Sequence, residues 1–163
     1  MKVSYQLLIL ALGSNLGQRD FYLKTAIEKL SGRVGKWLAN SLIYETVAIG
    51  VDPNHGDYLN MVVAFSSSLF PAELLAITQD IEKEFGRETK GDLKPRTLDI
   101  DIIWYGTPVK TQNLEIPHPR FLEREFVWRP MLDVIPDFLK EKSDSKVMNS
   151  GKSETGIRRI GCF

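Results

Sequence analysis

The order of strand and helix patterns along the chain predicts an α/β (α+β) fold, a ferredoxin-like βαββαβ sandwich with a mainly antiparallel sheet and helices packed on its faces. Three observations support this prediction. Apolar and β-branched runs alternate with two stretches of helical periodicity in the order β-α-β-β-α-β. Glycine and proline mark the boundaries between these runs. The 163 residues, 43% apolar and 26% charged, suit one globular domain with one core.

The first three elements are a strand, a helix and a strand. Residues 5–12 are almost continuously apolar and run into a glycine-rich turn at 13–17, which is typical of a central strand. A short secretory signal has a similar composition, but the weakly cationic start favours the strand. A helix ended by Gly32 follows, with an apolar face formed by Leu23, Ala26, Ile27 and Leu30. Residues 34–47 then predict a strand that ends near Thr46.

The next two elements are a strand and a helix. A loop at 48–57 contains glycine, proline and asparagine, and an apolar strand is predicted at 58–69. Pro71 opens the second helix and Gly86 provides a left-handed cap. The buried stripe of this helix is expected to be Leu74, Ile77, Ile81 and Phe85. Both helices of the predicted order should lie on one side of the sheet.

The last strand of the order is predicted at 98–105. The polar segment 87–95 before it is expected to be a mobile loop. Residues 117–119 predict an extended segment, because two prolines flank a histidine there. The region 120–134 should contain a short helix that starts late or is broken by Pro130.

Composition limits the classes of function. Polar residues dominate from Lys140 onward, so we divide the chain into a folded domain at 1–139 and a polar tail at 140–163. Basic and acidic residues number 21 each, so the chain has no broad attraction for nucleic acid or membrane. Cys162 is the only cysteine, which excludes an intrachain disulfide and a cysteine-based zinc cluster and favours a cytoplasmic setting.

Two carboxylates lie close together on the last predicted strand. Because side chains alternate across a strand, Asp99 and Asp101 share one face, and the other face should carry Leu98, Ile100, Ile102 and Trp104. The Cα atoms of the two residues are expected about 6.5 Å apart, and two anionic side chains so near each other favour a bound cation. Mg²⁺ takes one or two carboxylates together with phosphate oxygens and water. On spacing alone, two solvated carboxylates at a sheet edge are an equal alternative.

A basic segment precedes these aspartates. Within ten residues it contains Arg87, Lys90, Lys94 and Arg96. In a chain without net charge, such a cluster predicts a local anion site, although a solvated basic loop is the alternative that composition alone favours. A phosphate would suit both the basic cluster and a metal held by the aspartates. The combination therefore predicts an enzyme that uses a magnesium-bound nucleotide.

Several single residues are further candidates. Tyr58 and Asn60 share a strand face and offer an aromatic ring and an amide to a planar heterocycle, although Tyr58 could equally pack in the core. His118 could bind a nucleotide, whereas a lone histidine is more often structural. Ligand contact or ordinary core and surface placement are both open for Gln79, Glu82, Phe126 and Trp128. No Walker or G-x-G-x-x-G motif is present in the sequence.

The chain contains a set of characteristic segments: ALGSNLG (11–17), YET (44–46), DYLN (57–60), GR (86–87), PRTLDIDI (95–102) and IPHPRFLEREFV (116–127). Together they resemble the 6-hydroxymethyl-7,8-dihydropterin pyrophosphokinases of folate biosynthesis. The resemblance extends from about Tyr5 to Pro136. PRTLDIDI combined with PHPR at this separation is highly specific, whereas the glycine motif alone is not.

The resemblance implies transfer of pyrophosphate from ATP to the hydroxymethyl oxygen of the pterin, with release of AMP. Two Mg²⁺ ions would be held by Asp99 and Asp101, and the implied catalytic residues are these two together with Arg87 and Arg96, which would counter charge on the phosphates. The implied ATP contacts are Gln79, Glu82, Arg87, Lys90, Arg96, Ile102, His118 and Arg124. Both ATP and the pterin would be small-molecule substrates, and no nucleic acid, membrane or obligate protein partner is predicted.

The resemblance also implies a pterin site. The pterin would lie between the rings of Tyr58 and Phe126, while Asn60 and the backbone after Thr46 would contact its edge. The implied pterin contacts are Thr46, Val47, Ile49, Tyr58, Asn60, Asp99 and Phe126. The chain departs from the family pattern at Thr89, where a second arginine is common, and at Leu93-Lys94, where Trp-Gly is usual. These departures concern how the loop 87–95 closes and leave the metal and pterin residues in place.

Two other functions share much of this pattern. A ferredoxin-like nucleotide- or RNA-binding module without catalysis would have the same strand order, with exposed aromatic residues on its central strands. A metal-dependent nucleotidyl or phosphoryl transferase with a different acceptor would use the same aspartates. Only the pterin-side residues Tyr58, Asn60 and Phe126 distinguish that third function from the first.

Overall fold

The computed structural model describes residues 4–47, 55–87, 94–137 and 156–162. A six-stranded sheet has the strand order β5-β1-β4-β3-β8, and β2 pairs with β4 as well. Every strand pairing in this sheet is antiparallel. Because β2 and β3 share the position beside β4, the sheet has the topology expected of a βαββαβ sandwich. The predicted fold class is confirmed.

The central strand β1 (Gln6–Ser14) is longer than the sequence predicts. It lies between β4 (Tyr58–Ser67) and β5 (Asp99–Tyr105). Gly13 and Ser14 were expected in a turn, but both belong to the strand. The reason is that Gly13 pairs with Asn60 on one side and with Asp99 on the other, so tertiary pairing extends the strand past its apolar part.

Helix α1 (Arg19–Arg33) buries Leu23, Ala26 and Leu30, as its periodicity predicts. Gly32 does not end the helix, which corrects the sequence-based boundary. The glycine that the backbone requires is Gly35, whose φ is +143° and where a Cβ would lie 2.3 Å from the carbonyl oxygen of Ser66. The chain thus turns where it passes closest to β4, and only glycine fits there.

The strand predicted at 34–47 is divided into β2 (Lys36–Asn40) and β3 (Ile43–Thr46). At the break, Ser41 exchanges hydrogen bonds with Val62, whose N–H donates to the Ser41 hydroxyl at 2.9 Å. The N–H of Leu42 donates to the Asp133 carboxylate at 3.1 Å. These partners lie far away in the sequence, so local alternation could not reveal the interruption.

Helix α2 (Pro71–Glu84) begins with a proline in its first turn, and Gly86, whose φ is +88°, lies two residues after its end. The N–H of Arg87 donates to the carbonyl of Glu82 at 3.1 Å, and the N–H of Gly86 donates to the carbonyl of Lys83 at 2.8 Å. This is a Schellman motif, so the predicted left-handed cap is confirmed. It also fixes the backbone of Arg87 against the end of the helix.

A β-bulge lies in β5. Leu10 pairs with Ile102 but Ile9 pairs with Trp104, so the register shifts between them. Ile100 and Ile102 pack with α1 and α2, whereas Trp104 packs against the cluster beneath α3. The expectation that Trp104 shares the face of Ile100 is therefore wrong, because the bulge reverses the alternation.

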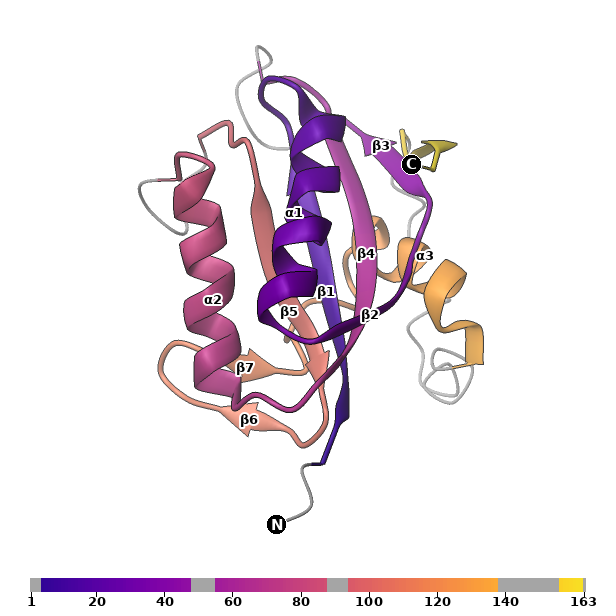
Figure 1. The fold of residues 1–163 in the computed structure, drawn as a ribbon. Coiled ribbons are helices and arrows are strands. Elements are labelled where there is room, and N and C mark those ends of the chain that lie inside the picture. Colours follow the sequence, from indigo (N-terminus) through magenta and orange to yellow (C-terminus); the bar gives the residue numbers. More distant parts are fainter. Residues whose placement is uncertain (1–3, 48–54, 88–93, 138–155, 163) are drawn as a thin grey trace.

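Helices cover both faces of the sheet (Figure 1). Helices α1 and α2 lie together on one face, and α3 (Glu125–Val134) lies on the other. The late start predicted for α3 is confirmed, but the helix continues through Pro130. The N–H that Pro130 lacks would have bonded to the carbonyl of Phe126, so only one rung of the helix is lost.

Three short strands complete the described structure. The strands β6 (Val109–Lys110) and β7 (Glu115–Ile116) form a separate two-stranded sheet. The strand β8 (Arg158–Gly161) lies in the segment predicted as a tail and pairs with β3. The end of that segment therefore contributes an edge strand that composition did not reveal, while the division at residue 139 stays a prediction. Within the described ranges, none of the helices is long and apolar enough to cross a membrane.

Candidate active site

Three neighbouring strands carry the main candidate residues in one row across the sheet. In register, Asp99 pairs with Gly13, Gly13 pairs with Asn60, and Asp101 pairs with Ala11. Residues paired in register point to the same face, so Asp99 and Asn60 face the same side. A Cβ on Gly13 would lie 3.4 Å from Asn60 Oδ1 and 4.0 Å from Asp99 Cβ. The small residues of β1 thus form the floor between the carboxylates and the amide.

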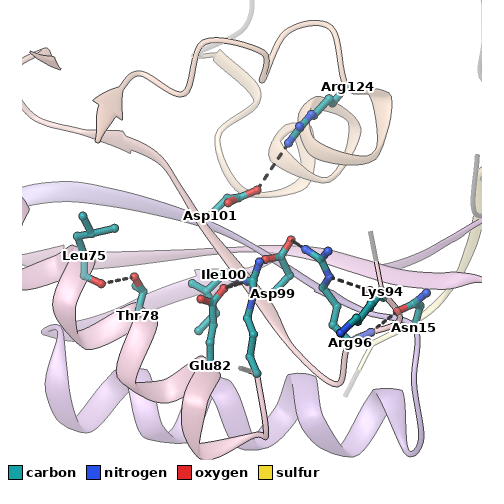
Figure 2. Close-up of polar contacts among 11 residues, drawn as sticks. Asn15, Leu75, Thr78, Glu82, Lys94, Arg96, Asp99, Ile100, Asp101 and Arg124 are labelled. Carbon is teal, nitrogen blue, oxygen red and sulfur yellow. Dashed lines mark hydrogen bonds and ion pairs between the residues drawn. The ribbon is translucent and has the colours of Figure 1, made fainter. Parts of the chain in front are cut away.

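Asp99 binds two arginines in this structure. Arg87 donates to Asp99 Oδ1, and Arg96 Nη1 donates to Asp99 Oδ2 at 3.3 Å. Arg87 also donates to Glu82, whose side chain is only 2% exposed. The same Glu82 carboxylate accepts the N–H of Ile100, which lies between the two aspartates, at 2.8 Å. Glu82 therefore joins α2, Arg87 and the backbone of β5, as Figure 2 shows for Glu82, Ile100 and Asp99.

The surroundings of Arg87 hold its guanidinium in the charged form. Burial alone would lower the pKa of Arg87, but the carboxylates of Asp99 and Glu82 outweigh burial and raise this pKa above its usual value. The Arg87 side chain is 7% exposed. The sequence placed Arg87 in a mobile loop, which is wrong for this residue because the helix cap and Glu82 both hold it. Residues 88–93 of that loop lie outside the described structure.

Arg96 is positioned through its backbone by Asn15. The side-chain oxygen of Asn15 accepts the N–H of Arg96 at 2.8 Å, and the N–H of Asn15 donates to the Arg96 carbonyl at 3.0 Å. Asn15 is itself buried. Asn15 had no predicted role of its own, although it lies in the glycine-rich segment 11–17. The available signal was an amide directly after a strand, a residue type that often fixes neighbouring backbone.

Asp101 faces a different partner. Its Oδ2 lies 3.6 Å from Nη1 of Arg124, and both side chains are about one quarter exposed. Figure 2 shows Asp101 directed toward Arg124, the residue directly before α3, while Asp99 is directed toward Arg96. The Arg124 guanidinium also lies over the ring of Phe126, 5.8 Å from its centroid. The start of α3 thus brings a cation and an aromatic ring to the carboxylates.

The other end of the row is polar but uncharged. Asn60 is buried and donates through Nδ2 to the hydroxyl of Thr46 at 2.9 Å. Thr46 pairs in register with Tyr58, whose ring is half-buried. Burial raises the pKa of Tyr58, with Arg96 opposing this rise and Asp99 adding to it. These effects place the Tyr58 hydroxyl within the electrostatic reach of the charged end.

Some predicted nucleotide contacts lie apart from this row. The Ile102 side chain is buried among the core residues beneath α1 and α2, so it points away from the carboxylates. The burial of Glu82 excludes the surface placement that the sequence left open. Gln79 is half-buried on α2, one turn before Glu82. His118 is half-buried, and its N–H donates to the carbonyl of Ile103 at 2.9 Å, two residues beyond Asp101 on β5.

The remaining predicted contacts lie at the edges of the described structure. Val47 follows β3 and is 53% exposed. Phe126 is half-buried on α3. Like Trp128, it packs against the apolar cluster between α3 and the sheet. Ile49 and Lys90 lie outside the described residues, so their predicted roles stay predictions.

The donor set at Asp99 and Asp101 suits one class of metal. Within residues 4–47, 55–87, 94–137 and 156–162, no group of three or more His, Cys, Asp or Glu side chains could form a metal cage. Two carboxylates on one face fit a metal whose remaining ligands are phosphate oxygens and water, which is how Mg²⁺ is usually held. Asp99 already attracts two guanidinium groups. The residues present therefore fit Mg²⁺ bound together with a nucleotide better than zinc, which favours nitrogen and sulfur ligands.

Comparisons with a protein-family model and with known relatives all identify the same family. Residues 9–136 match the family described as "7,8-dihydro-6-hydroxymethylpterin-pyrophosphokinase (HPPK)". A Porphyromonas gingivalis protein named 2-amino-4-hydroxy-6-hydroxymethyldihydropteridine pyrophosphokinase is 46% identical over 132 residues, covering 78% of this chain and 89% of the relative. A Bacillus subtilis protein of the same name is 36% identical over 154 residues, covering 91% and 92%.

Solved structures resemble the fold. A crystal structure of wild-type Plasmodium falciparum HPPK-DHPS with pterin and p-hydroxybenzoate has a TM-score of 0.70 to this chain at 15% sequence identity. The match covers 98% of this chain and 47% of that one, so this chain spans about half the length of the solved protein. At this identity the likeness concerns the fold alone, and it agrees with the layered sheet and helices described above.

Proposed function

Because this chain belongs to the 7,8-dihydro-6-hydroxymethylpterin-pyrophosphokinase family, we propose that it transfers pyrophosphate from ATP to 6-hydroxymethyl-7,8-dihydropterin in folate biosynthesis. The hydroxymethyl oxygen attacks the β-phosphorus, the bond from that phosphorus to the α-phosphate oxygen breaks, and AMP leaves. The hydroxyl proton passes to solvent. The observation that carries the site assignment is the row Asp99-Gly13-Asn60, which joins a charged end to a neutral polar end.

Asp99 and Asp101 are the proposed metal ligands. Two Mg²⁺ ions held there would neutralise and align the triphosphate. The two carboxylates share one face, and the residues beside them on β1 are the small residues Gly13 and Ala11. This arrangement supports a ligand that bridges the two aspartates and extends over β1.

Arg87 and Arg96 are the proposed counter-charges for the phosphates. Both guanidinium groups bind Asp99 in this structure. Once cations accompany the nucleotide at Asp99, these groups can turn to phosphate oxygens, because the carboxylate then has other positive partners. Glu82 keeps one buried contact to Arg87 throughout, so we assign Glu82 as a positioning residue in place of the predicted ATP contact. Arg124 beside Asp101 is a further proposed nucleotide contact.

The pterin is proposed to lie over the neutral end. Asn60 and Thr46 form a fixed polar edge, and the ring of Tyr58 is half-buried next to them. Phe126 on α3 would supply the opposite ring, with Val47 at the margin of the site. An amide presents a donor and an acceptor in one plane, which matches the edge of a pterin ring. Ile102 contributes to the core, so its side chain is left out of the proposed ATP site.

A binding module without catalysis is the main alternative. It does not account for two carboxylates and a buried amide on one face of the sheet, with three arginines around the carboxylates. The family match spans both ends of this row and favours the enzyme. Cytoplasmic location, the absence of an obligate protein partner and the requirement for Mg²⁺ stay predictions.

The test is the product formed from Mg-ATP. Purified protein with hydroxymethyl-dihydropterin should release AMP and pterin diphosphate, and it should release neither without the pterin. Phosphate transfer to another acceptor would instead give ADP. Removal of Mg²⁺ by a chelator should stop AMP release. Failure to form AMP with this acceptor would overturn the proposed function.

A further inference from the structure

The strand β8 lies against the outer edge of β3, although more than a hundred residues separate the two in the sequence. Tyr44 pairs with Arg159, and Glu45 pairs with Arg158. In Figure 1 this strand, at the C-terminus, lies beside β3 on the side away from β4. Tyr44 and Glu45 are therefore held between β4 and β8, and Thr46 directly follows them.

A charged cluster fastens this edge. Glu45 accepts hydrogen bonds from Arg158 at 2.5 Å and from Arg19 at 3.0 Å, and its side chain is 14% exposed. Arg19 on α1 also donates to the carbonyl of Asp57 at 2.6 Å, directly before β4 begins at Tyr58. One carboxylate thus links β8 and β3 to α1 and, through Arg19, to the start of β4. The Arg158 contact is the main cause of a lowered pKa at Glu45.

This edge is also the support of the neutral end of the site. Thr46 directly follows Glu45 and accepts the hydrogen bond from Asn60. Because adjacent residues of a strand point to opposite faces, Glu45 holds the strand from one face while Thr46 serves the site on the other. Gly156, which precedes β8, adds a close contact: its φ is +126°, and a Cβ there would lie 3.1 Å from Cγ2 of Val47.

We propose that β8 is a clasp that sets the affinity for the pterin by fixing β3 and hence the Thr46 hydroxyl. The proposal rests on the proposed function for the identity of the ligand. The strand β8 acts through Thr46 and Asn60. Arg158 on β8 and Glu45 on β3 are therefore positioning residues that need not touch substrate. The charged end of the site is attached to β5 and α2, and it should not depend on β8.

The test compares kinetics for the two substrates in matched variants. Arg158→Ala should raise KM for the pterin about fivefold, as expected for the loss of one partly exposed ion pair, with KM for ATP and kcat within about twofold of wild type. Arg158→Lys should restore most of the affinity. The matched control is Arg159→Ala, which removes the same charge from the opposite face of the same strand. Truncation after Thr155 removes the whole strand and should raise KM for the pterin about tenfold.

Fluorescence titration with 6-hydroxymethylpterin and thermal unfolding of each variant separate affinity from folding. Equal KM values for wild type and Arg158→Ala would overturn the clasp, as would a parallel rise for both substrates. If truncation prevented folding, Arg158→Ala and its lysine rescue would still decide the question. Wild-type protein that released no AMP would contradict the proposed function instead, and the titration would still show whether β8 supports pterin binding.

Discussion

The two ends of the row on the sheet are held by different chemistry. The Asp99 end is a set of ion pairs in which Arg87 bridges Glu82 and Asp99 while Arg96 binds Asp99 from the other side. The Asn60 end depends on one neutral hydrogen bond to Thr46. Buried charges are stable only with their partners, whereas a neutral hydrogen bond is worth about 1 kcal/mol and makes little difference to its neighbours.

This difference implies that the two ends of the site respond differently when substrates bind. The charged end must exchange partners when a nucleotide arrives, because Arg87 and Arg96, which are proposed to bind phosphate, now pair with Asp99, the proposed metal ligand. At the neutral end, the Asn60–Thr46 hydrogen bond is already formed and is proposed to stay in place when the pterin binds. Changes to the buried ion pairs of Glu82, Arg87 and Asp99 should therefore affect both stability and chemistry, while changes at the neutral end should affect one substrate.

Loss of a metal ligand should have the largest effect. Asp101→Asn should lower kcat for AMP release about 1,000-fold, because the triphosphate loses a charge-neutralising group, while the unfolding midpoint stays unchanged. Asp80→Asn, at an exposed carboxylate on α2, is the matched control and should keep full activity. A variant of Asp101 that retained a tenth of the wild-type rate would show that this carboxylate does not hold the metal.

Removal of the buried carboxylate at the charged end should come next. Glu82→Ala leaves the Arg87 guanidinium buried with fewer partners and the Ile100 N–H without its acceptor, and should lower the free energy of unfolding by about 3 kcal/mol. Glu84→Ala removes an exposed carboxylate from the same helix and should cost far less stability than Glu82→Ala, because solvent screens its ion pairs with Lys29 and Arg33. Urea denaturation measures both. Similar losses of unfolding free energy in the two variants would mean that Glu82 contributes no more to stability than an exposed carboxylate.

The neutral end should respond selectively. Thr46→Val keeps the side-chain shape but removes the acceptor for Asn60, and should raise KM for the pterin about fivefold to tenfold with KM for ATP unchanged. Thr78→Val, at a buried hydroxyl on α2, is the control. If Thr46→Val raised both KM values equally, the two ends would not be independent.

The smallest expected effect is the pH dependence of the stability that Glu45 contributes at the edge of β3. The folded-state pKa of Glu45 lies below its ordinary value of 4.5, chiefly because Arg158 donates to it. A lowered pKa stabilises the folded state at pH above the ordinary value, and this contribution disappears as pH falls through the folded-state pKa. The stability difference between wild type and Glu45→Gln should therefore be below about 1 kcal/mol at pH 7 and shrink toward pH 3. Constant stability differences across this range would contradict the assignment.

Local periodicity was enough to predict part of this site. Alternation along PRTLDIDI correctly placed Asp99 and Asp101 on one face, because both precede the bulge. The same rule failed for Trp104, which follows it. Helical spacing and the Gly86 cap identified α2, and the cap geometry explains why Arg87 lies where it does. These features depend on neighbours within a few residues.

The features that could not be predicted depend on distant partners. Asn15 meets Arg96 across 81 positions, and Glu82 meets Ile100 across 18. Gly13 was expected in a turn, yet its place in β1 is decided by strands on both sides. The pairing of β8 has the same origin, since a strand of only four residues is too short to show alternation and forms only where an edge is available.

The floor residue Gly13 has one more consequence. Asp99 and Asn60 lie on either side of it, so the two ends of the site are separated by two strand spacings, about 10 Å between backbones. Backbone hydrogen bonds hold that length constant, whereas side-chain rotamers would let it vary. The sheet thus acts as a ruler between the site of phosphate chemistry and the site of ring recognition. Any molecule that occupies both must match its length, and a linker between a phosphate mimic and a flat heterocycle could be designed to the same measure.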